Sequence, residues 1–343
     1  MIKSYSTLFV LFLLSHLSIS QNIDSLIQNG NKLRTIGNSD LAIVEYKKAL
    51  TINKKSSDAN YEIAYTYQVI NDYKNTIKYC NRVIRLKSTR IIEAYILKGS
   101  ALDYLGKQKK STRLYCQTIK QYPNNYLLEY NLGITYHNRN KLADAEIHYI
   151  KSMEIDRLQP SSHYMLGILM NDRGDRVKSM LSLYFFLLLE PNTERSEEAL
   201  KLLTDLWQKN LEVNPLTPNS VIITYNPNKE SIAFNAIDLD ISSIYARNSG
   251  LNRPKQNDYE SFISNTLSLF SLLGDYNNTI SQEPWKTLYI KIFKDLATTN
   301  LVEPFCYYIS SSNDNMLING WLELNKEKID ILSNWVNQRL IER

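Results

Sequence analysis

Glycine, histidine and cysteine are all scarce in this chain of 343 residues. It holds ten glycines, four histidines and three cysteines. No Gly-rich loop of the G-x-G-x-x-G or Walker type is present, which argues against nucleotide binding by those routes. Three cysteines are too few, and odd in number, for a disulfide scaffold. The histidines lack HExxH or H-x-H spacing and no CxxC occurs, so we expect no metal and no cofactor.

Long apolar runs are also rare, and the first has the form of a targeting segment. Leu8–Leu14 follows Lys3 and precedes the small residues Ser18 and Ser20. This order is typical of a secretory signal peptide and predicts that residues 1–20 are removed. An uncleaved N-terminal anchor is the alternative. We expect the mature protein in the periplasm or outside the cell, without an integral membrane segment.

The second apolar run is Met180–Leu189, which ends at Glu190 and Pro191. A bilayer span needs about 20 apolar residues, so this segment of ten is predicted to be a buried helix. It is apolar on every side, whereas a helix at a protein surface keeps one polar face. We therefore expect the following helix and the C-terminal domain to pack around it as one body.

Small residues recur with a period of about 34 residues in the first half of the chain. The members of this series are Gly30, Ala64, Gly99, Gly133 and Gly167. Seven positions after each of them comes a residue suited to a tight turn: Gly37, Asn71, Gly106, Asn140 and Gly174. Apolar residues between these marks recur at helical spacing. The pattern predicts repeated units of two helices each.

This pattern resembles the tetratricopeptide repeat (TPR) family, whose units of 34 residues form two antiparallel helices. Family members carry small residues at positions 8, 20 and 27 and an aromatic residue at position 24. The matches in the first and fourth units are Gly30, Ala42, Tyr46, Ala49, Leu132, Gly133, Tyr136, Ala145 and Tyr149. The departures in the other units are Thr76, Cys80, Val83, Thr118, Ser179 and Phe186. The resemblance implies a mainly α fold, an α-solenoid of about five helix-turn-helix repeats.

The second half of the chain has a different composition. Pro215, Pro218 and Pro227 mark a boundary,. We predict a TPR solenoid over 21–193, a capping helix over 194–211 and a mostly helical C-terminal domain over 212–343. Within that domain we expect one strand at 221–225 and helices at 259–273, 284–297, 302–310 and 321–340. The segments Glu303–Ser310 and Trp321–Asn325 resemble exported TPR proteins of bacterial cell envelopes, which implies no known activity.

Charge is divided unevenly between the two halves. Residues 21–193 carry a net charge of +9 and residues 194–343 a net charge of −5. By the family resemblance, the first helix of each unit lines a concave groove, and those positions hold five tyrosines, five acids and one arginine. The positive charge therefore falls mostly on the second helices and turns. Such a groove disfavours nucleic acid and lacks the carboxylate clamp of some TPR domains.

We expect a non-catalytic, exported protein–protein interaction module that holds a peptide segment or a partner protein in this groove. Tyrosine suits such a surface because it combines a large contact area with a polar tip. The expected groove residues are Tyr61, Tyr65, Asp103, Tyr104, Tyr130, His137, Asn138, Tyr164 and Asn171. The plainer interpretation is that these tyrosines complete the packing between repeats.

Two other functions stay open from the sequence. The chain is a structural subunit of a cell-envelope or secretion assembly if its basic outer face is the contact surface. It is an enzyme if the C-terminal domain holds an unrecognised site, although no catalytic motif supports one.

Asp238 and Asp240 are a weak candidate for a cation site, since two acids alone make no binding loop. Cys80 and Cys306 are expected in the core.

Overall fold

The computed structural model describes residues 22–214, 216, 220–224, 227, 232–248, 258–313 and 315–341. The predicted signal segment, residues 1–20, lies outside these ranges. The chain divides into two compact units, Met1–His148 and Tyr149–Arg343, and each is described by itself. Within the described ranges, no helix combines the length and the hydrophobicity that a bilayer span requires.

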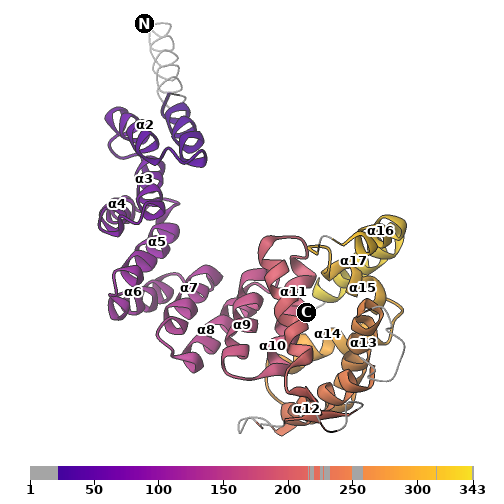
Figure 1. The fold of residues 1–343 in the computed structure, drawn as a ribbon. Coiled ribbons are helices and arrows are strands. Elements are labelled where there is room, and N and C mark those ends of the chain that lie inside the picture. The colour runs from indigo at the N-terminus through magenta and orange to yellow at the C-terminus, as the bar shows by residue number, and fades with distance from the viewer. Residues whose placement is uncertain are drawn as a thin grey trace, which may run out of the picture. The chain divides into compact units, whose positions relative to one another are not determined.

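The first unit is a succession of helices that pack in chain order (Figure 1). A helix over residues 22–35 comes first. The following helices are α2 (Ser39–Ile52), α3 (Ser57–Val69), α4 (Tyr73–Leu86), α5 (Ile91–Tyr104), α6 (Gln108–Gln121), α7 (Tyr126–His137) and α8 (Leu142–Ile155), the last of which continues into the second unit. The helices α3, α5 and α7 also contact one another in turn. The first helices of successive pairs therefore lie side by side.

The turn inside each helix pair contains a residue with a left-handed backbone. Its φ angle is positive at every predicted turn position, namely Gly37, Asn71, Gly106, Asn140 and Gly174. Glycine and asparagine tolerate this conformation better than other residues. After two of these turns, Asp72 and Asp175 cap the next helix by accepting hydrogen bonds from the backbone N–H of Asn75 and Lys178. The predicted turns are confirmed.

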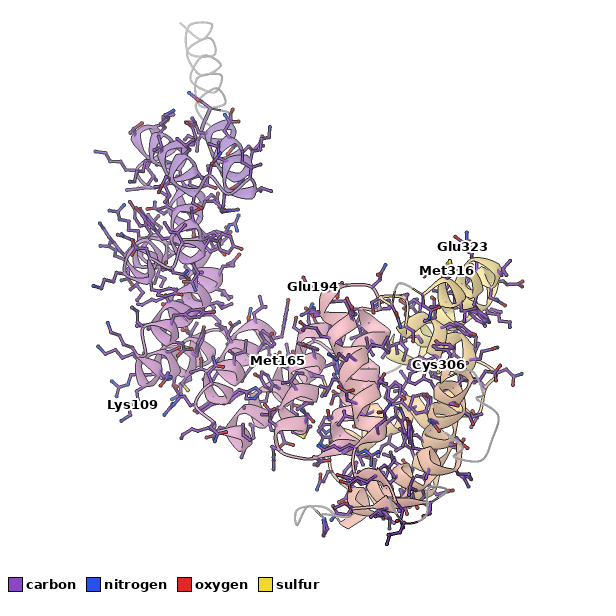
Figure 2. The ribbon with its side chains drawn as sticks, in the orientation of Figure 1. Lys109, Met165, Glu194, Cys306, Met316 and Glu323 are labelled. Carbon is purple, nitrogen blue, oxygen red and sulfur yellow. The ribbon has the colours of Figure 1, made fainter. Side chains whose placement is uncertain are left out.

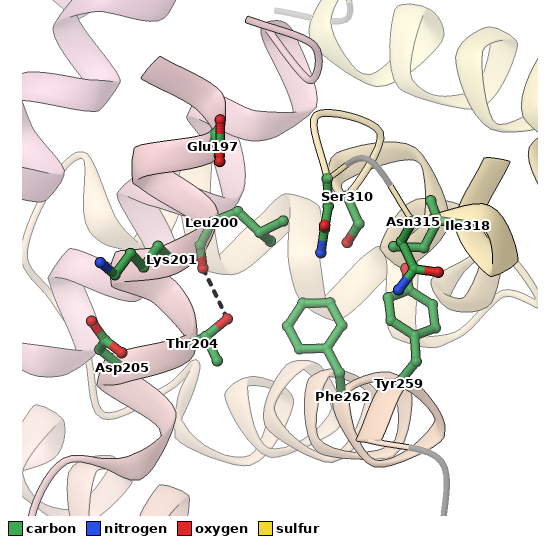
Figure 3. Close-up of a pocket in the computed structure, with 11 residues that line it drawn as sticks. Glu197, Leu200, Lys201, Thr204, Asp205, Tyr259, Phe262, Ser310, Asn315 and Ile318 are labelled. Carbon is green, nitrogen blue, oxygen red and sulfur yellow. Dashed lines mark hydrogen bonds between the residues drawn. The ribbon is translucent and has the colours of Figure 1, made fainter. Parts of the chain in front are cut away.

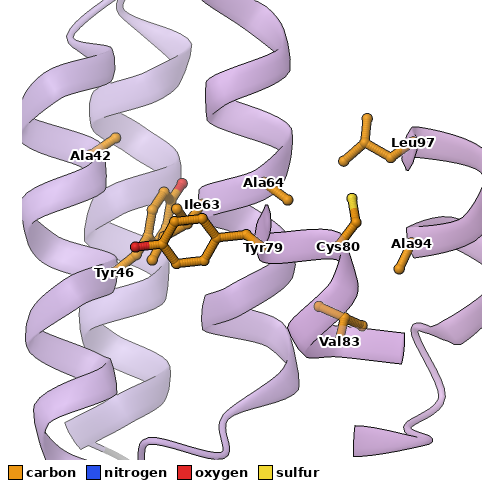
Figure 4. Packing of buried hydrophobic residues seen from close by; sticks show 9 residues of the cluster. All are labelled: Ala42, Tyr46, Ile63, Ala64, Tyr79, Cys80, Val83, Ala94 and Leu97. Carbon is orange, nitrogen blue, oxygen red and sulfur yellow. The ribbon is translucent and has the colours of Figure 1, made fainter. Parts of the chain in front are cut away.

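Small residues in the first helix of a pair make room for large ones in the second. A Cβ atom placed on Gly30 would overlap the ring of Tyr46, and one on Gly99 would overlap Tyr115. Between the pairs, apolar side chains of several helices form one buried cluster (Figure 4). Cys80 is fully buried in this cluster, as predicted. Each pair is thus closed by the next one along the chain.

The second unit joins the end of α8 and the fifth helix pair to the C-terminal elements. Its helices are α9 (Pro160–Asp172), α10 (Arg176–Leu189), α11 (Glu194–Gln208), α12 (Ile232–Asn248), α13 (Asp258–Tyr276), the π-helix η1 (Trp285–Ile290), α14 (Lys291–Ala297), α15 (Val302–Ile309), α16 (Met316–Leu324) and α17 (Lys326–Ile341). Two short antiparallel strands, β1 (Leu211–Val213) and β2 (Val221–Ile223), pair with Leu211 opposite Ile223. The described residues are therefore mainly helical, as predicted.

Helix α10 forms the centre of the second unit. Every residue from Arg176 to Leu188 is buried. The helix contacts α9, α11, α12, α15 and η1. The ring of Tyr184 lies 5.1 Å from Phe270 and 5.9 Å from Phe293. The expectation that the following helix and C-terminal helices cover this apolar segment is confirmed.

A buried arginine fastens α10 to the helices around it. Arg176 donates hydrogen bonds to the carbonyl oxygens of Leu206 (2.6 Å) and Trp207 (2.9 Å) at the end of α11. It also donates to Asp238 Oδ1 (3.2 Å) and Ser242 Oγ (2.8 Å) of α12. Burial lowers the pKa of this guanidinium, and the carboxylate of Asp238 opposes that shift. Because every nitrogen of the guanidinium donates to a partner, the buried charge is tolerated,.

Several elements differ from the sequence prediction. The helix expected over 194–211 ends at Gln208, since Asn210 adopts a positive φ and Leu211 begins β1. The single helix expected over 321–340 is wrong: α16 and α17 are separate, and the side chain of Asn325 donates to the Trp321 carbonyl oxygen where α16 ends. Helix α12 was not predicted at all. The repeat period and the compact units also divide the chain at different places, because the fifth pair belongs to the second unit.

Candidate functional site

The nine predicted groove residues are divided between the two units. Tyr164 and Asn171 belong to α9 in the second unit, and both are half-buried. The others lie on or at the ends of α3, α5 and α7 in the first unit: Tyr61, Tyr65, Asp103, Tyr104, Tyr130, His137 and Asn138. We call the surface formed by the helix over 22–35 together with α3, α5 and α7 the first-helix surface.

Two tyrosines of α3 are each covered by an arginine from a neighbouring pair. The rings of Tyr61 and Tyr65 are nearly parallel, with centroids 6.5 Å apart. The guanidinium of Arg34 lies 4.7 Å from the Tyr65 ring, and that of Arg90 lies 4.9 Å from the Tyr61 ring. Such contacts are attractive because the face of an aromatic ring is electron-rich. Burial raises the pKa of Tyr61 to about 12, so its hydroxyl stays neutral.

Carboxylates hold both arginines in place. Arg34 Nη1 lies 2.5 Å from Glu62 Oε2, and Arg90 Nη2 lies 3.9 Å from the other oxygen of Glu62. Arg90 also donates to Asp58 at 3.0 Å. The charges balance within this cluster. The arginines therefore pack on the tyrosines and are not a preformed clamp for an anion.

Sequence reasoning missed Arg90 and Glu62. Arg90 is the N-cap of α5 and thus precedes the helical positions that line a groove. Glu62 lies one residue beyond Tyr61 and is buried. The signal available in the sequence was spacing, because Arg90 stands 32 residues after Asp58.

Asp103 makes a contact between helix pairs and is not an open surface residue. Its Oδ2 accepts a hydrogen bond of 2.6 Å from Thr135 on α7. Burial raises the pKa of this carboxyl. One pair earlier, Gln68 Nε2 donates to Ser100 Oγ over 3.2 Å. Both bonds join the first helices of neighbouring pairs at a separation of 32 residues. The first-helix surface is therefore continuous from α3 to α7.

The remaining predicted residues of the first unit differ in their exposure. Tyr104 is 67% exposed and its ring stacks on Tyr73, with centroids 4.9 Å apart and planes 5° apart. Asn138 is exposed where α7 ends, whereas Tyr130 and His137 are half-buried. Tyr104 therefore packs against Tyr73 of α4 and is not part of the stack of Tyr61 and Tyr65.

Tyr164 makes local contacts within the second unit. Its hydroxyl donates to Glu198 of α11 at 3.0 Å, and its ring centroid lies 4.9 Å from that of Phe186. Gly167, three residues after Tyr164, is the small residue of this pair. A Cβ atom placed on it would come within 2.9 Å of Leu183 of the second helix. The fifth pair thus repeats the packing of the first and third pairs.

In the first, third and fifth pairs, a glycine of the first helix lies against a large side chain of the second helix. Seven residues after each of these glycines, the turn contains a residue with a left-handed backbone. These two features together define the fold. The helix pairs have the TPR fold. No protein-family model and no curated protein matches the chain. Several solved TPR structures resemble it over about half its length.

Three of these structures illustrate the similarity. TTC0263, a TPR protein of Thermus thermophilus, has a TM-score of 0.46 and 15% identity over 54% of this chain and 98% of its own. PilF of Pseudomonas aeruginosa has a TM-score of 0.45 and 20% identity, covering 59% and 95%. YrrB, described as a TPR protein with an unusual peptide-binding site, has a TM-score of 0.37 and 18% identity, covering 53% and 97%.

Two of the second helices, α4 and α6, are strongly positive, whereas α2 and α8 carry acidic residues as well. Helices α4 and α6 contain no acidic residue. Their exposed basic side chains, of which Lys109 is labelled in Figure 2, form no ion pair within the described ranges. They are Lys74, Lys78, Arg85, Lys109, Lys110, Arg113 and Lys120.

The other candidates for chemistry are engaged in structural contacts. Asp238 pairs with Arg176, while Asp240 accepts a hydrogen bond from Tyr276 at 2.9 Å, so the two carboxylates serve different partners. His163 is fully buried, with Nδ1 at 2.7 Å from the Tyr289 hydroxyl and Nε2 at 2.9 Å from the Arg157 carbonyl oxygen. Among the described residues, no three metal-binding side chains come together.

A cleft of about 530 Å³ opens in the second unit (Figure 3). Helix α11 forms one side of it, and α13 together with Ser310, Asn313, Asn315 and Ile318 forms the other. Its floor holds the half-buried Phe262 and the buried Ile318, and Leu200 of α11 points toward Phe262. Sequence reasoning missed this cleft, because its sides come from segments more than 50 residues apart.

Proposed function

We propose that this protein is a non-catalytic interaction module and that its first-helix surface holds a segment of a partner protein. The observation that carries the proposal is the stack of Tyr61 and Tyr65 under Arg90 and Arg34. These side chains present flat, partly apolar surface that is fixed before a partner arrives. Fixed aromatic surface favours association because little conformational freedom is lost on binding.

The exposed tyrosines supply contact area for that partner. Tyr65 is 41% exposed and Tyr104 is 67% exposed. Covering both would remove on the order of 200 Å² from water, worth on the order of 5 kcal/mol before the cost of association. Because the arginines are already paired with Glu62 and Asp58, we propose a segment with apolar anchors and not an acidic tail.

We also propose that the protein acts outside the cytoplasm. The support is the signal-like order of Lys3, the apolar run Leu8–Leu14 and the small residues before Gln21,. N-terminal sequencing of the protein from its own cells should give a chain that starts near Gln21. A chain that starts at Met1 would contradict this part of the proposal.

Photo-cross-linking in the source cells tests the surface. A benzoylphenylalanine at position 65 should form a covalent adduct with one protein, and Tyr104→Ala should reduce its yield at least five-fold. The matched control places the same group at position 109, on α6. An adduct that forms only from position 109 would contradict the proposal.

That last outcome would instead support a second function, a structural subunit of a larger assembly. The observation in its favour is the acid-free surface of α4 and α6, whose exposed basic side chains form no ion pair with any residue that the structure describes. Lys109→Ala together with Lys110→Ala should then release the protein from its complex, whereas Tyr65→Ala should not. Sedimentation of the native complex distinguishes these results.

A further inference from the structure

The cleft beside α11 has the dimensions of a ligand site. Its volume of about 530 Å³ lies within the range of about 300–1,000 Å³ that is usual for ligand pockets,. From Glu197 to Asp205, the α11 side is about 12 Å long, at a rise of about 1.5 Å per residue. That length is close to the distance of about 13 Å between the first and the fifth residue of an extended chain, at about 3.3 Å per residue.

The rim of the cleft on α11 carries charges of alternating sign. Glu197, Lys201 and Asp205 follow one another at four-residue spacing, and all three are exposed. In Figure 3, Lys201 and Asp205 point away from Phe262 and Tyr259, so their charged ends lie at the outer edge of the α11 side of the cleft. Within the described ranges none of the three forms an ion pair. Neighbouring charges are therefore about 6 Å apart along the helix and available to a ligand.

An extended peptide repeats its side chains at nearly this interval. Successive side chains point to opposite sides of a strand, so every second one recurs after about 6.6 Å. We propose that this cleft binds an extended peptide in which two basic side chains flank an acidic one at alternate positions. The three charged side chains reach Glu197, Lys201 and Asp205, and the apolar side chains between them face the floor.

The floor of the cleft fits those intervening side chains. Leu200, Phe262 and Ile318 supply apolar contact, while Asn313 and Asn315 supply polar groups at the opposite edge. The Tyr259 ring is already packed against Tyr307, with centroids 4.6 Å apart. The net negative rim disfavours phosphate.

This site does not depend on the proposed function, because it lies wholly in the second unit. The tyrosines of the first-helix surface belong to the first unit. Substituting Tyr65 and Tyr104 with alanine should therefore leave peptide binding at the cleft unchanged. Failure of one proposal is thus distinguishable from failure of the other.

Fluorescence anisotropy with the full mature chain tests the proposal. The probes are two labelled, end-blocked peptides, Lys-Leu-Glu-Leu-Lys and its charge-reversed counterpart Glu-Leu-Lys-Leu-Glu. Charges at an interface rim mainly set specificity, and each exposed pair changes affinity by a factor of about two to five. We expect the first peptide to bind at least ten-fold tighter at low salt. The preference should shrink in 1 M NaCl, where the screening length is about 3 Å.

A reversed rim gives the decisive comparison. The variant Glu197→Lys, Lys201→Glu, Asp205→Lys should bind Glu-Leu-Lys-Leu-Glu tighter, which a misfolded protein would not do. The matched control Glu194→Lys changes a charge on α11 outside the cleft and should keep the original preference. The proposal is overturned if the wild type separates the two peptides by less than two-fold or binds neither at 1 mM. It is also overturned if the reversed variant keeps the wild-type order.

Discussion

Single residues explain both what the sequence predicts of the candidate site and what it leaves out. The period of 34 residues places Tyr61 and Tyr65 on the first helix of a pair, and the structure brings their rings together. The same period does not indicate that Arg34 and Arg90, from the pairs on either side, cover those rings. It also places Asp103 on the first-helix surface, where Thr135 of the next pair in fact binds it. Contacts between pairs depend on side-chain reach, which a repeat pattern does not contain.

His163 makes the second unit sensitive to acid. The histidine lies between the Tyr289 hydroxyl and the Arg157 carbonyl oxygen, with the Phe185 ring 4.4 Å away. Burial lowers the pKa of this imidazole to about 4, because a charged ring would lose its hydration. The unfolded chain, with a pKa of about 6.5, binds the proton first as the pH falls. The stability from neutral His163 is thus complete above pH 6.5 and is lost between pH 6.5 and 4.

We predict that the free energy of unfolding of the second unit falls by on the order of 3 kcal/mol between pH 7.5 and 4.5 because of His163. His163→Gln should be less stable at pH 7.5 and should lack this loss, because the amide keeps a donor and an acceptor but does not titrate. Urea unfolding followed by tryptophan fluorescence measures it, since all four tryptophans lie in this unit. Equal losses in the wild type and the variant would contradict the assignment.

At the scale of elements, the repeated pairs were predictable and the C-terminal elements were less so. A left-handed residue at a fixed step and apolar residues at helical spacing define where each pair turns. The break between α16 and α17 has no such mark, because Asn325 ends α16 through a side-chain bond to its own helix. Helix α12 was missed although Ser231, a residue type favoured at helix starts, stands directly before its first residue, Ile232,. The side of the cleft opposite α11 depends on tertiary packing that local patterns do not encode.

Arg176 joins three elements, α10, α11 and α12. We predict that Arg176→Met lowers the free energy of unfolding of the second unit by about 3–5 kcal/mol, because the Leu206 and Trp207 carbonyl oxygens and Asp238 lose their donor,. The matched control is Arg195→Met, which removes a part-exposed pair with Glu190 and should cost less than about 1 kcal/mol,. Hydrogen exchange of the α12 amides should accelerate only in the first variant. Equal effects would show that burial of Arg176 adds nothing.

At the scale of the molecule, the fifth TPR pair depends on the C-terminal helices. A chain that ends at residue 210 keeps α9, α10 and α11 but lacks α12, α15 and η1, which cover α10. We predict that this chain exposes Tyr184, Phe185 and their neighbours, binds a hydrophobic dye and associates. Size-exclusion chromatography and dye fluorescence measure these properties. A monomeric fragment with native near-ultraviolet circular dichroism would contradict the dependence.

The glycine and asparagine turns also bear on how such a chain changes length over generations. In the described part of the first unit, the helices of one pair contact those of the next pair along the chain, so a duplicated or deleted 34-residue step there would leave each remaining pair beside another pair of the same fold. The fifth pair has no such freedom, because α10 is enclosed on all sides. We therefore expect changes in repeat number before residue 149, and we expect the fifth pair to be kept together with the C-terminal helices that cover α10.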